Sequence, residues 1–173
     1  MDADSFARRL DAWMSLLRTQ SRLLDLLEAD LKRRVGITIP RFDVLAQLDR
    51  NGGSLRFQRL ADAILLSRSG LSRLLDRMQR DGLVARQGHP EDARGQVASL
   101  TPLGRKVLDK ARTVHNANVQ RWFIDQVGDA EADVIAEALR RVRLALPGGP
   151  AAEEAIVWGP AGQTRPGGRE APG

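Results

Sequence analysis

Apolar residues recur at helical spacing through most of the chain, and the longest such pattern comes first. Residues 5–35 carry two offset apolar stripes with the i, i+3, i+4 spacing of a helix. The first stripe holds Leu10, Trp13, Leu17, Leu24, Leu27 and Leu31, and the second holds Leu16, Leu23 and Leu26. A helix that is apolar on two sides must be covered on two sides. A partner subunit is the favoured cover, and the core of a monomer is the alternative.

Shorter patterns follow. Pro40 suits the first turn of a second helix, whose buried face would hold Phe42, Val44, Leu45 and Leu48 before Asn51-Gly52-Gly53 ends it. Residues 54–55 are expected to form a very short strand that joins later strands. Residues 57–66 predict a third helix, with Phe57, Leu60, Ala61 and Ile64 facing inward.

Residues 67–82 form the stretch around which the rest is organised. Ser67 is a suitable N-cap, Gly82 a suitable stop, and the apolar stripe holds Leu71, Leu74, Leu75 and Met78. Another face carries Ser69, Ser72, Arg73, Asp76 and Arg80, with Arg68 and Arg77 beside it. Arginine binds phosphates and the acceptor edge of guanine, so this face suits a DNA major groove. An ordinary charged surface helix explains the stretch alone equally well.

The residues after this helix favour DNA binding. Residues 83–87 are strand-like, residues 89–95 are rich in polar turn formers, and residues 96–101 alternate polar and apolar positions as a half-buried strand does. This order predicts a β-hairpin wing. Arg94 stands where the wing would follow the minor groove, and Asp92 is close enough in sequence to hold its guanidinium by a charge-assisted pair.

Two helical patterns end the folded part. Residues 102–123 predict a long helix, and residues 130–146 predict a final one that Asp129 would cap. The sequence thus indicates a mainly α domain at residues 5–146, with a helix-turn-helix at 57–82 and a wing at 83–101. The Gly- and Pro-rich residues 147–173 are expected to be a disordered tail.

Composition excludes several classes of protein. The 27 Lys and Arg outnumber the 22 Asp and Glu, giving a net charge of +5 that suits a polyanionic partner. Without cysteine there is no disulfide, thiolate catalysis or iron–sulfur cluster. The two histidines, His89 and His115, lack zinc-ligand spacing. No catalytic motif, signal peptide or membrane-length apolar run is present, so we expect a cytoplasmic protein that is no enzyme and needs no metal or cofactor.

Several motifs resemble the MarR family of bacterial transcription regulators. They are Leu60-Ala61-Asp62-Ala63, the stretch at 67–78, Asp81-Gly82-Leu83-Val84, Pro90-Glu91-Asp92-Ala93-Arg94 and residues 99–104. Their order and separations extend the resemblance over about residues 8–146. The resemblance implies a winged helix-turn-helix with long terminal dimerisation helices. It also implies a homodimer that binds a pseudo-palindromic double-stranded DNA operator.

The resemblance further implies which residues meet DNA and ligand. The DNA-facing residues would be Ser67, Arg68, Ser69, Ser72, Arg73 and Arg77, with Arg94 as the wing arginine paired with Asp92. Ala93 departs from relatives that carry a second basic residue there, which puts one phosphate contact in doubt. A urate-responsive branch has residues that Asp43, Arg73 and Arg86 match and that Trp13 resembles. A structural ion pair of Asp43 with Arg73 or Arg86 is the favoured alternative to a ligand role.

The expected function is sequence-specific DNA binding by a transcription regulator. A repressor released by a small aromatic or anionic ligand is the favoured form. The alternative is a winged-helix module for protein interaction or architecture, without ligand response.

Overall fold

A computed structural model describes residues 2–64, 66–89 and 92–147, with backbone alone at 88–89 and 92–95. The helices are α1 (Ala3–Val35), α2 (Ile39–Arg50), α3 (Phe57–Ala63), α4 (Arg68–Arg80), α5 (Pro102–Trp122) and α6 (Asp129–Ala145), with a 3₁₀ turn η1 (Ile124–Gln126) between the last two. The strands are β1 (Ser54–Arg56), β2 (Val84–His89) and β3 (Asp92–Leu100). The mainly α winged helix-turn-helix is therefore confirmed.

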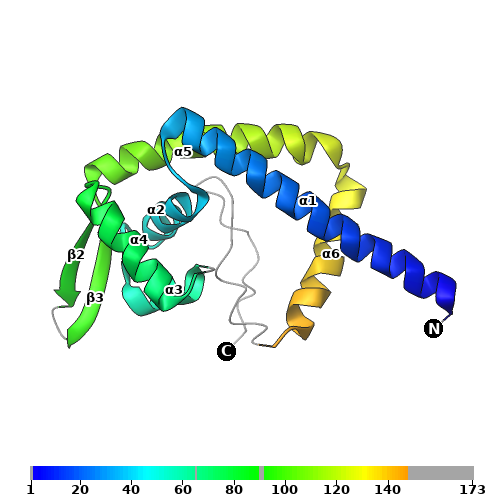
Figure 1. Cartoon of the computed structure of the whole chain (residues 1–173), viewed down its shortest axis with the longest axis horizontal. Helices are drawn as coiled ribbons and strands as arrows, with labels where there is room; N and C mark the ends of the chain where they lie inside the picture. The colour runs from blue at the N-terminus through cyan, green and yellow to red at the C-terminus, as the bar shows by residue number, and fades with distance from the viewer. Residues whose placement is uncertain (1, 65, 90–91, 148–173) are drawn as a thin grey trace, which may run out of the picture.

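The molecule has a small lobe and a long helical arm (Figure 1). The lobe contains α2, α3, α4 and the strands, while α1 and α5 leave it side by side and α6 follows η1 at the far end of α5. Among the described residues, no helix combines the length and apolar character that crossing a bilayer requires.

The three strands form one antiparallel sheet in the order β1-β3-β2. Leu55 pairs with Ala98 and Arg86 pairs with the same residue from the other side, so β3 is central. The expected short strand at 54–55 is confirmed. The hairpin is longer than expected because β2 reaches His89 and β3 starts at Asp92, inside the segment that was expected to be a polar loop.

The hydrophobic core lies almost entirely in the lobe. Its largest fully buried side chains are Leu31, Leu45, Leu48, Leu60, Leu71, Leu75, Met78, Leu108, Val44 and Val84. Leu31 is the one buried residue of α1, and α6 has none. Helices α1 and α6 therefore contribute little to the core of their own chain, whereas α5 adds Leu108 and Ala111.

Local contacts set where the helices begin and end. Asp2 caps α1 by accepting the Ser5 N–H at 2.6 Å, and Gly36 ends it at a φ of +80° that other residues rarely adopt. Thr38 makes no side-chain cap bond for α2; instead the Glu28 carboxylate of α1 accepts the Ile39 N–H at 2.6 Å. A side chain from one helix thus fixes the start of the next.

Two helix boundaries differ from the expectation. The third helix ends at Ala63, three residues early, and Ile64 continues in an extended conformation while its side chain stays buried. Gly128, rather than Asp129, is the N-cap of α6, because the Glu131 carboxylate accepts the Gly128 N–H at 3.0 Å. At the end of α3 the buried position of Ile64 sets the boundary, and at the start of α6 the bond between Glu131 and Gly128 does so. Neither boundary follows the local sequence pattern.

Candidate nucleic-acid interface

Helix α4 presents a buried face and a polar face, as its sequence predicts. The Ser67 hydroxyl accepts the Gly70 N–H at 3.1 Å and so caps the helix. Leu71, Leu75 and Met78 are fully buried and Leu74 nearly so, which anchors α4 to the lobe. The opposite face must then point outward, whatever the helix binds.

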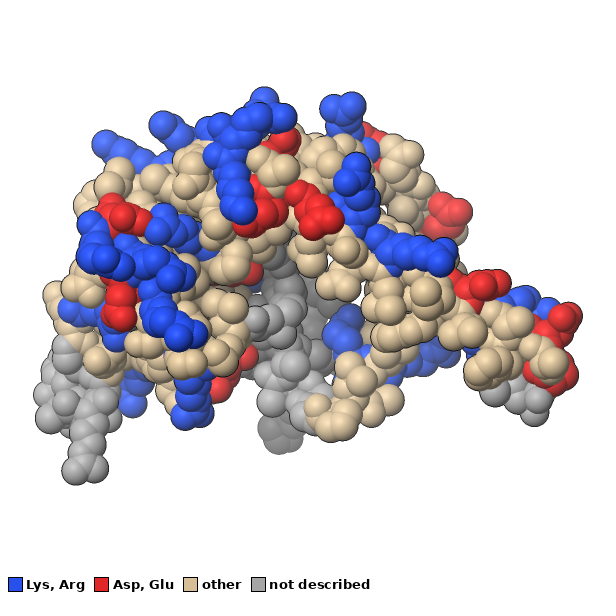
Figure 2. Space-filling model, in the orientation of Figure 1, with Lys and Arg blue, Asp and Glu red and all other residues tan. Residues whose placement is uncertain are grey.

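The outward face holds the residues expected to meet DNA. Ser67, Arg68, Ser69, Arg73 and Arg77 are exposed, and Ser72 is half-buried. Figure 2 shows basic side chains gathered over this part of the surface. Neither Arg68, Arg73 nor Arg77 forms an ion pair with another described residue. Their guanidinium groups remain available for phosphates or base edges.

Asp76 also lies on this face, where its carboxylate would repel a polyanion. Its Oδ1 accepts a hydrogen bond from Nη1 of Arg86 on β2, and Nη2 of Arg86 donates to Oε1 of Gln96 on β3. The guanidinium is half-buried, with 16% of the side chain exposed. This three-residue joint was missed at the sequence level because its members are ten residues apart and each looks like a surface residue.

The wing exists as a hairpin of β2 and β3, with an irregular register between Gly88 and His89. Asp92 and Arg94 belong to β3 by their backbone. Their side chains lie outside the described residues, so the Asp92–Arg94 pair stays a prediction. The 148–173 part of the expected tail also lies outside the described residues.

The candidate ligand residues are spread over the molecule. Trp13 is about half exposed, and it precedes Glu28 by fifteen positions of the same helix, about 22 Å at the rise of an α-helix. Asp43 interacts electrostatically with Glu28, so one chain does not bring Trp13 and Asp43 together. Arg73 is exposed on α4, and the hydrogen bonds of Arg86 go to the joint described above. The ligand role of these four residues stays a prediction.

Asp43 nevertheless has an unusual environment. Burial, together with the nearby negative charge of Glu28, raises the pKa of Asp43 to about 7. On the preceding position, Phe42 stacks on the His115 ring of α5, with centroids 5.1 Å apart. Burial lowers the pKa of His115, against an opposing bond to Asn116. Two buried titratable groups with shifted pKa values, Asp43 on α2 and His115 on α5, therefore belong to the helices that join the lobe to the arm.

A second junction fixes α2 to α5. Asp49 accepts hydrogen bonds from Arg105 and, at 2.7 Å, from Arg112. Burial acts to raise the pKa of Asp49, but these two bonds outweigh it and leave the pKa below its usual value. The two arginines donate to the carboxylate of Asp49, so these three side chains satisfy one another's hydrogen bonds. We therefore assign the cluster a structural role.

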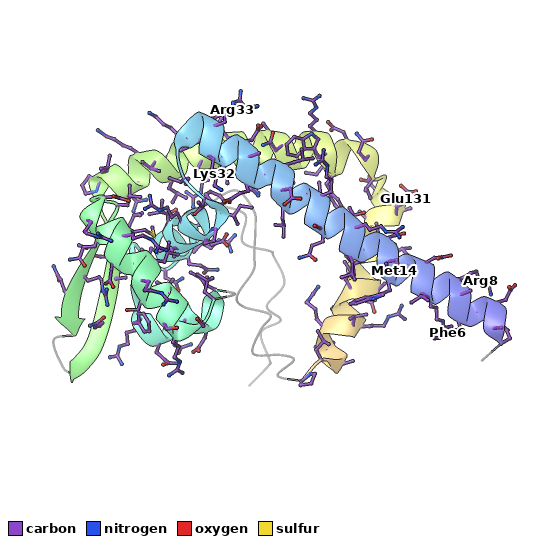
Figure 3. The ribbon with its side chains drawn as sticks, in the orientation of Figure 1. Phe6, Arg8, Met14, Lys32, Arg33 and Glu131 are labelled. Carbon is purple, nitrogen blue, oxygen red and sulfur yellow. The ribbon has the colours of Figure 1, made fainter. Side chains whose placement is uncertain are left out.

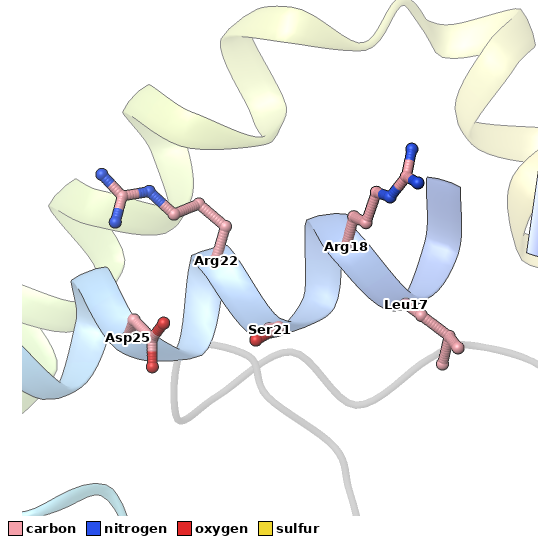
Figure 4. Close-up of a pocket in the computed structure, with 5 residues that line it drawn as sticks. All are labelled: Leu17, Arg18, Ser21, Arg22 and Asp25. Atoms are coloured by element: carbon pink, nitrogen blue, oxygen red, sulfur yellow. The ribbon is translucent and has the colours of Figure 1, made fainter. Parts of the chain in front are cut away.

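The surface hollow in Figure 4 does not coincide with the candidate ligand residues. It is lined by Leu17, Arg18, Ser21, Arg22 and Asp25, all from α1. A hollow with one helix as its wall does not enclose a small molecule. In the described residues no group of His, Asp and Glu is placed to hold a metal ion.

Comparisons with known proteins agree with this geometry. The sequence model of the MarR family matches residues 35–95. The structure of AbsC, a MarR family transcriptional regulator from Streptomyces coelicolor, is 32% identical, covers 77% of this chain and 90% of its own, and superposes with a TM-score of 0.73. That of Sco3205, from the same organism and in complex with DNA, is 29% identical, covers 81% and 88%, and has a TM-score of 0.75. The transcriptional repressor IacR of Pseudomonas putida is 27% identical over 70% of this chain and 71% of its own.

Proposed function

This chain belongs to the MarR family of transcriptional regulators, and we propose that it is a homodimeric repressor that a small aromatic or anionic ligand releases from its operator. It is a DNA-binding regulator, and its relatives are regulators rather than enzymes. The observation that carries the DNA-binding assignment is the outward face of α4, with three exposed arginines that make no ion pair with a described residue. The similarity to Sco3205, which was solved with DNA, supports it.

The proposed mode of binding follows from the shape of the lobe. In a helix-turn-helix the second helix enters the major groove, so α4 would read base edges through Ser69, Ser72 and Arg73. Arg68 and Arg77, at the sides of that face, would hold phosphates. The hairpin of β2 and β3 would lie along the adjacent minor groove, with Arg94 as its contact. The protein would act in the cytoplasm, where its operator lies.

The homodimer is proposed from the uncovered apolar surface of the arm. Exposed large apolar side chains lie on α1, at the junction of α5 and η1, and on α6; they include Phe6, Leu10, Trp13, Leu17, Leu24, Phe123, Ile124, Val134, Ile135 and Val142. Phe6 and Met14 lie on the half of α1 that extends away from the lobe (Figure 3). A monomer rarely leaves so many large apolar side chains exposed to water on one part of its surface. A symmetric dimer would cover it and present two copies of α4.

The experiment that tests this function is recovery of bound fragments from a genomic library with the purified protein. A symmetric dimer should select half-sites repeated as a palindrome, with centres about 10 bp apart. A variant with Arg68, Arg73 and Arg77 all changed to alanine serves as the control and should recover no enriched sequence. Enrichment of the same fragments by this variant would place the DNA contact elsewhere.

The alternative function is a winged-helix module that binds protein or DNA without reading sequence. Only a sequence reader shifts an operator fragment in the presence of excess random competitor DNA. Equal competition by random and operator DNA would favour the alternative.

The ligand response is proposed for the region of Asp43, together with Trp13, Arg73 and Arg86. Since the pKa of Asp43 is about 7, a large share of this carboxyl is protonated at neutral pH and can donate a hydrogen bond to an anionic ligand. Urate and salicylate, added to the protein–operator complex, should lower the fluorescence anisotropy of labelled DNA. Asp43→Asn leaves the α4 face untouched. It should change the ligand concentration that is required to release the operator. An unchanged response would remove Asp43 from the site.

A further inference from the structure

The strands β2 and β3 have one face toward the core and one toward solvent, and the register shows on which face Arg86 lies. Opposed residues of an antiparallel pair share a face, and the same face recurs at every second position. Val84 and Ala98 are each 2% exposed and belong to the inward face. Arg86 pairs with Ala98, and Gly88 pairs with Gln96, so Arg86 and Gln96 share the inward face.

This position is unusual for an arginine. Along β2 the inward residues are Val84, Arg86 and Gly88, so the apolar contact with the lobe stops at Val84. Ala98, opposite Arg86 on β3, is also buried, and among the hairpin residues whose side chains are described it is the last buried one toward the wing tip. Arg86 supplies the next inward contact, a polar one, by donating from one guanidinium nitrogen to Asp76 and from the other to Gln96.

We propose that Arg86 is a positioning residue for DNA binding: by joining Asp76 of α4 to Gln96 of β3, it fixes the direction of the wing relative to the recognition helix. The guanidinium is planar, with its donors in a rigid fork, so two simultaneous bonds fix direction as well as distance. The same pairing neutralises the carboxylate of Asp76 on the face that meets DNA. The role rests on the proposed DNA contact of the wing.

A positioning role has a signature that lost stability does not produce. If Arg86 holds the wing in place, the wing arginine Arg94 contributes to affinity only while the joint is intact. We therefore measure the factor by which Arg94→Ala weakens operator binding, by fluorescence anisotropy, in several backgrounds. In Arg86→Gln this factor should fall toward one. Gln96→Ala, which keeps the Arg86–Asp76 pair, should reduce it in the same way.

The matched control is the ion pair between Arg41 of α2 and Asp81, the C-cap of α4. It resembles the Arg86–Asp76 pair in exposure, with 20% and 48% of the two side chains exposed against 16% and 55%. It also holds an α4 carboxylate but does not touch the wing. Arg41→Gln should leave the Arg94→Ala factor unchanged, within the roughly twofold variation of independent sites.

Arg86→Lys separates positioning from neutralisation, because a single ammonium keeps the charge beside Asp76 without the two-armed fork. It should behave like Arg86→Gln. Thermal unfolding of each variant confirms that it is folded at the assay temperature. An Arg94→Ala factor that is the same in wild type, Arg86→Gln and Gln96→Ala overturns the positioning role, and so does wild-type behaviour of Arg86→Lys.

Failure of the underlying function is recognised separately. If wild-type protein binds the recovered duplexes no more tightly than random DNA, the regulator function is overturned before any variant is compared. Wild-type protein that binds its operator but is indifferent to Arg94→Ala would overturn both the wing contact and the role of Arg86, while leaving α4 as the reader.

Discussion

Individual arginines of the lobe differ in what they already contact, and this decides what each can do. Arg86 donates from its two terminal nitrogens to Asp76 and Gln96, whereas Arg73 is exposed and makes no ion pair with a described residue. An unpaired guanidinium on a recognition helix can bond a guanine edge in two places. Arg73 is therefore the side chain that we expect to discriminate between sequences.

Arg73→Ala should narrow the gap between operator and random DNA, by roughly 1–3 kcal/mol if one bidentate base contact is lost. Arg94→Ala should instead weaken both DNAs by similar factors and reduce the slope of log affinity against log salt by about one unit. Anisotropy titrations of both variants on both DNAs at several salt concentrations measure these effects. If Arg94→Ala alters neither affinity nor slope, the wing does not contact DNA.

Asp43 should make stability depend on pH. Its pKa is about 7 in the folded chain and near 3.8 when unfolded, so between these values the folded state holds a proton that the unfolded state has lost. The contribution of this carboxyl to the free energy of unfolding is fully present below pH 3.8. It decreases as the pH rises and is lost once the pH has passed 7. An asparagine side chain at this position would be neutral at every pH. The free energy of unfolding of Asp43→Asn should therefore match that of wild type at pH 4 and exceed it at pH 8 by an amount on the order of 3 kcal/mol.

Urea unfolding of both proteins across this pH range, at one protein concentration, measures the effect. Burial lowers the pKa of His115, and the contribution of His115 to the pH dependence cancels in the difference between wild type and Asp43→Asn if the two groups act independently. A difference that is constant from pH 4 to pH 8 would contradict the raised pKa of Asp43.

At the scale of elements, the lobe depends on a close approach between α5 and the turn that follows α4. Thr101 caps α5 by accepting the Gly104 N–H at 2.9 Å, and its hydroxyl also donates to the Gly82 and Leu83 carbonyls. A Cβ on Gly104 would lie 2.0 Å from the Leu83 carbonyl oxygen, which belongs to the backbone and cannot rotate away. Only glycine fits at this crossing.

Gly104→Ala should destabilise the protein by about 3 kcal/mol or more, because the backbone of α5 or of the turn must shift. Gly128→Ala is the matched control at the N-terminus of α6, where a Cβ would meet Glu131 at an ordinary 3.6 Å. Midpoints of thermal unfolding compare the two variants. Equal, small losses would show that α5 can move away from Leu83 at little cost.

At the scale of the whole molecule, the core of the lobe and the uncovered surface of the arm are separate. Leu24 is 42% exposed and Leu139 is half-buried, although both belong to apolar stripes. Leu24→Asp or Leu139→Asp would place a charge inside a dimer interface, where it has no partner. Each should yield monomers or insoluble protein. Leu103→Asp, which changes an exposed residue of the first turn of α5 beside the lobe, should remain dimeric.

Sedimentation velocity at micromolar concentration distinguishes these results. Wild-type protein that sediments as a monomer would contradict dimerisation through the arm, and a monomeric Leu103→Asp would shift the interface toward the lobe.

The sequence by itself determined the helices and the position of the wing, because apolar residues recur with a period of 3.6 along α1 and α4 and of two along the strands. It also identified the serine and arginine face of α4. Only the tertiary structure decided that Glu28 caps α2, that Gly128 caps α6, and that Arg86 joins Asp76 to Gln96. The Glu28 and Arg86 contacts depend on how the elements pack, and the Gly128 cap depends on a bond from its backbone N–H to the Glu131 side chain. A periodic pattern carries no information about either.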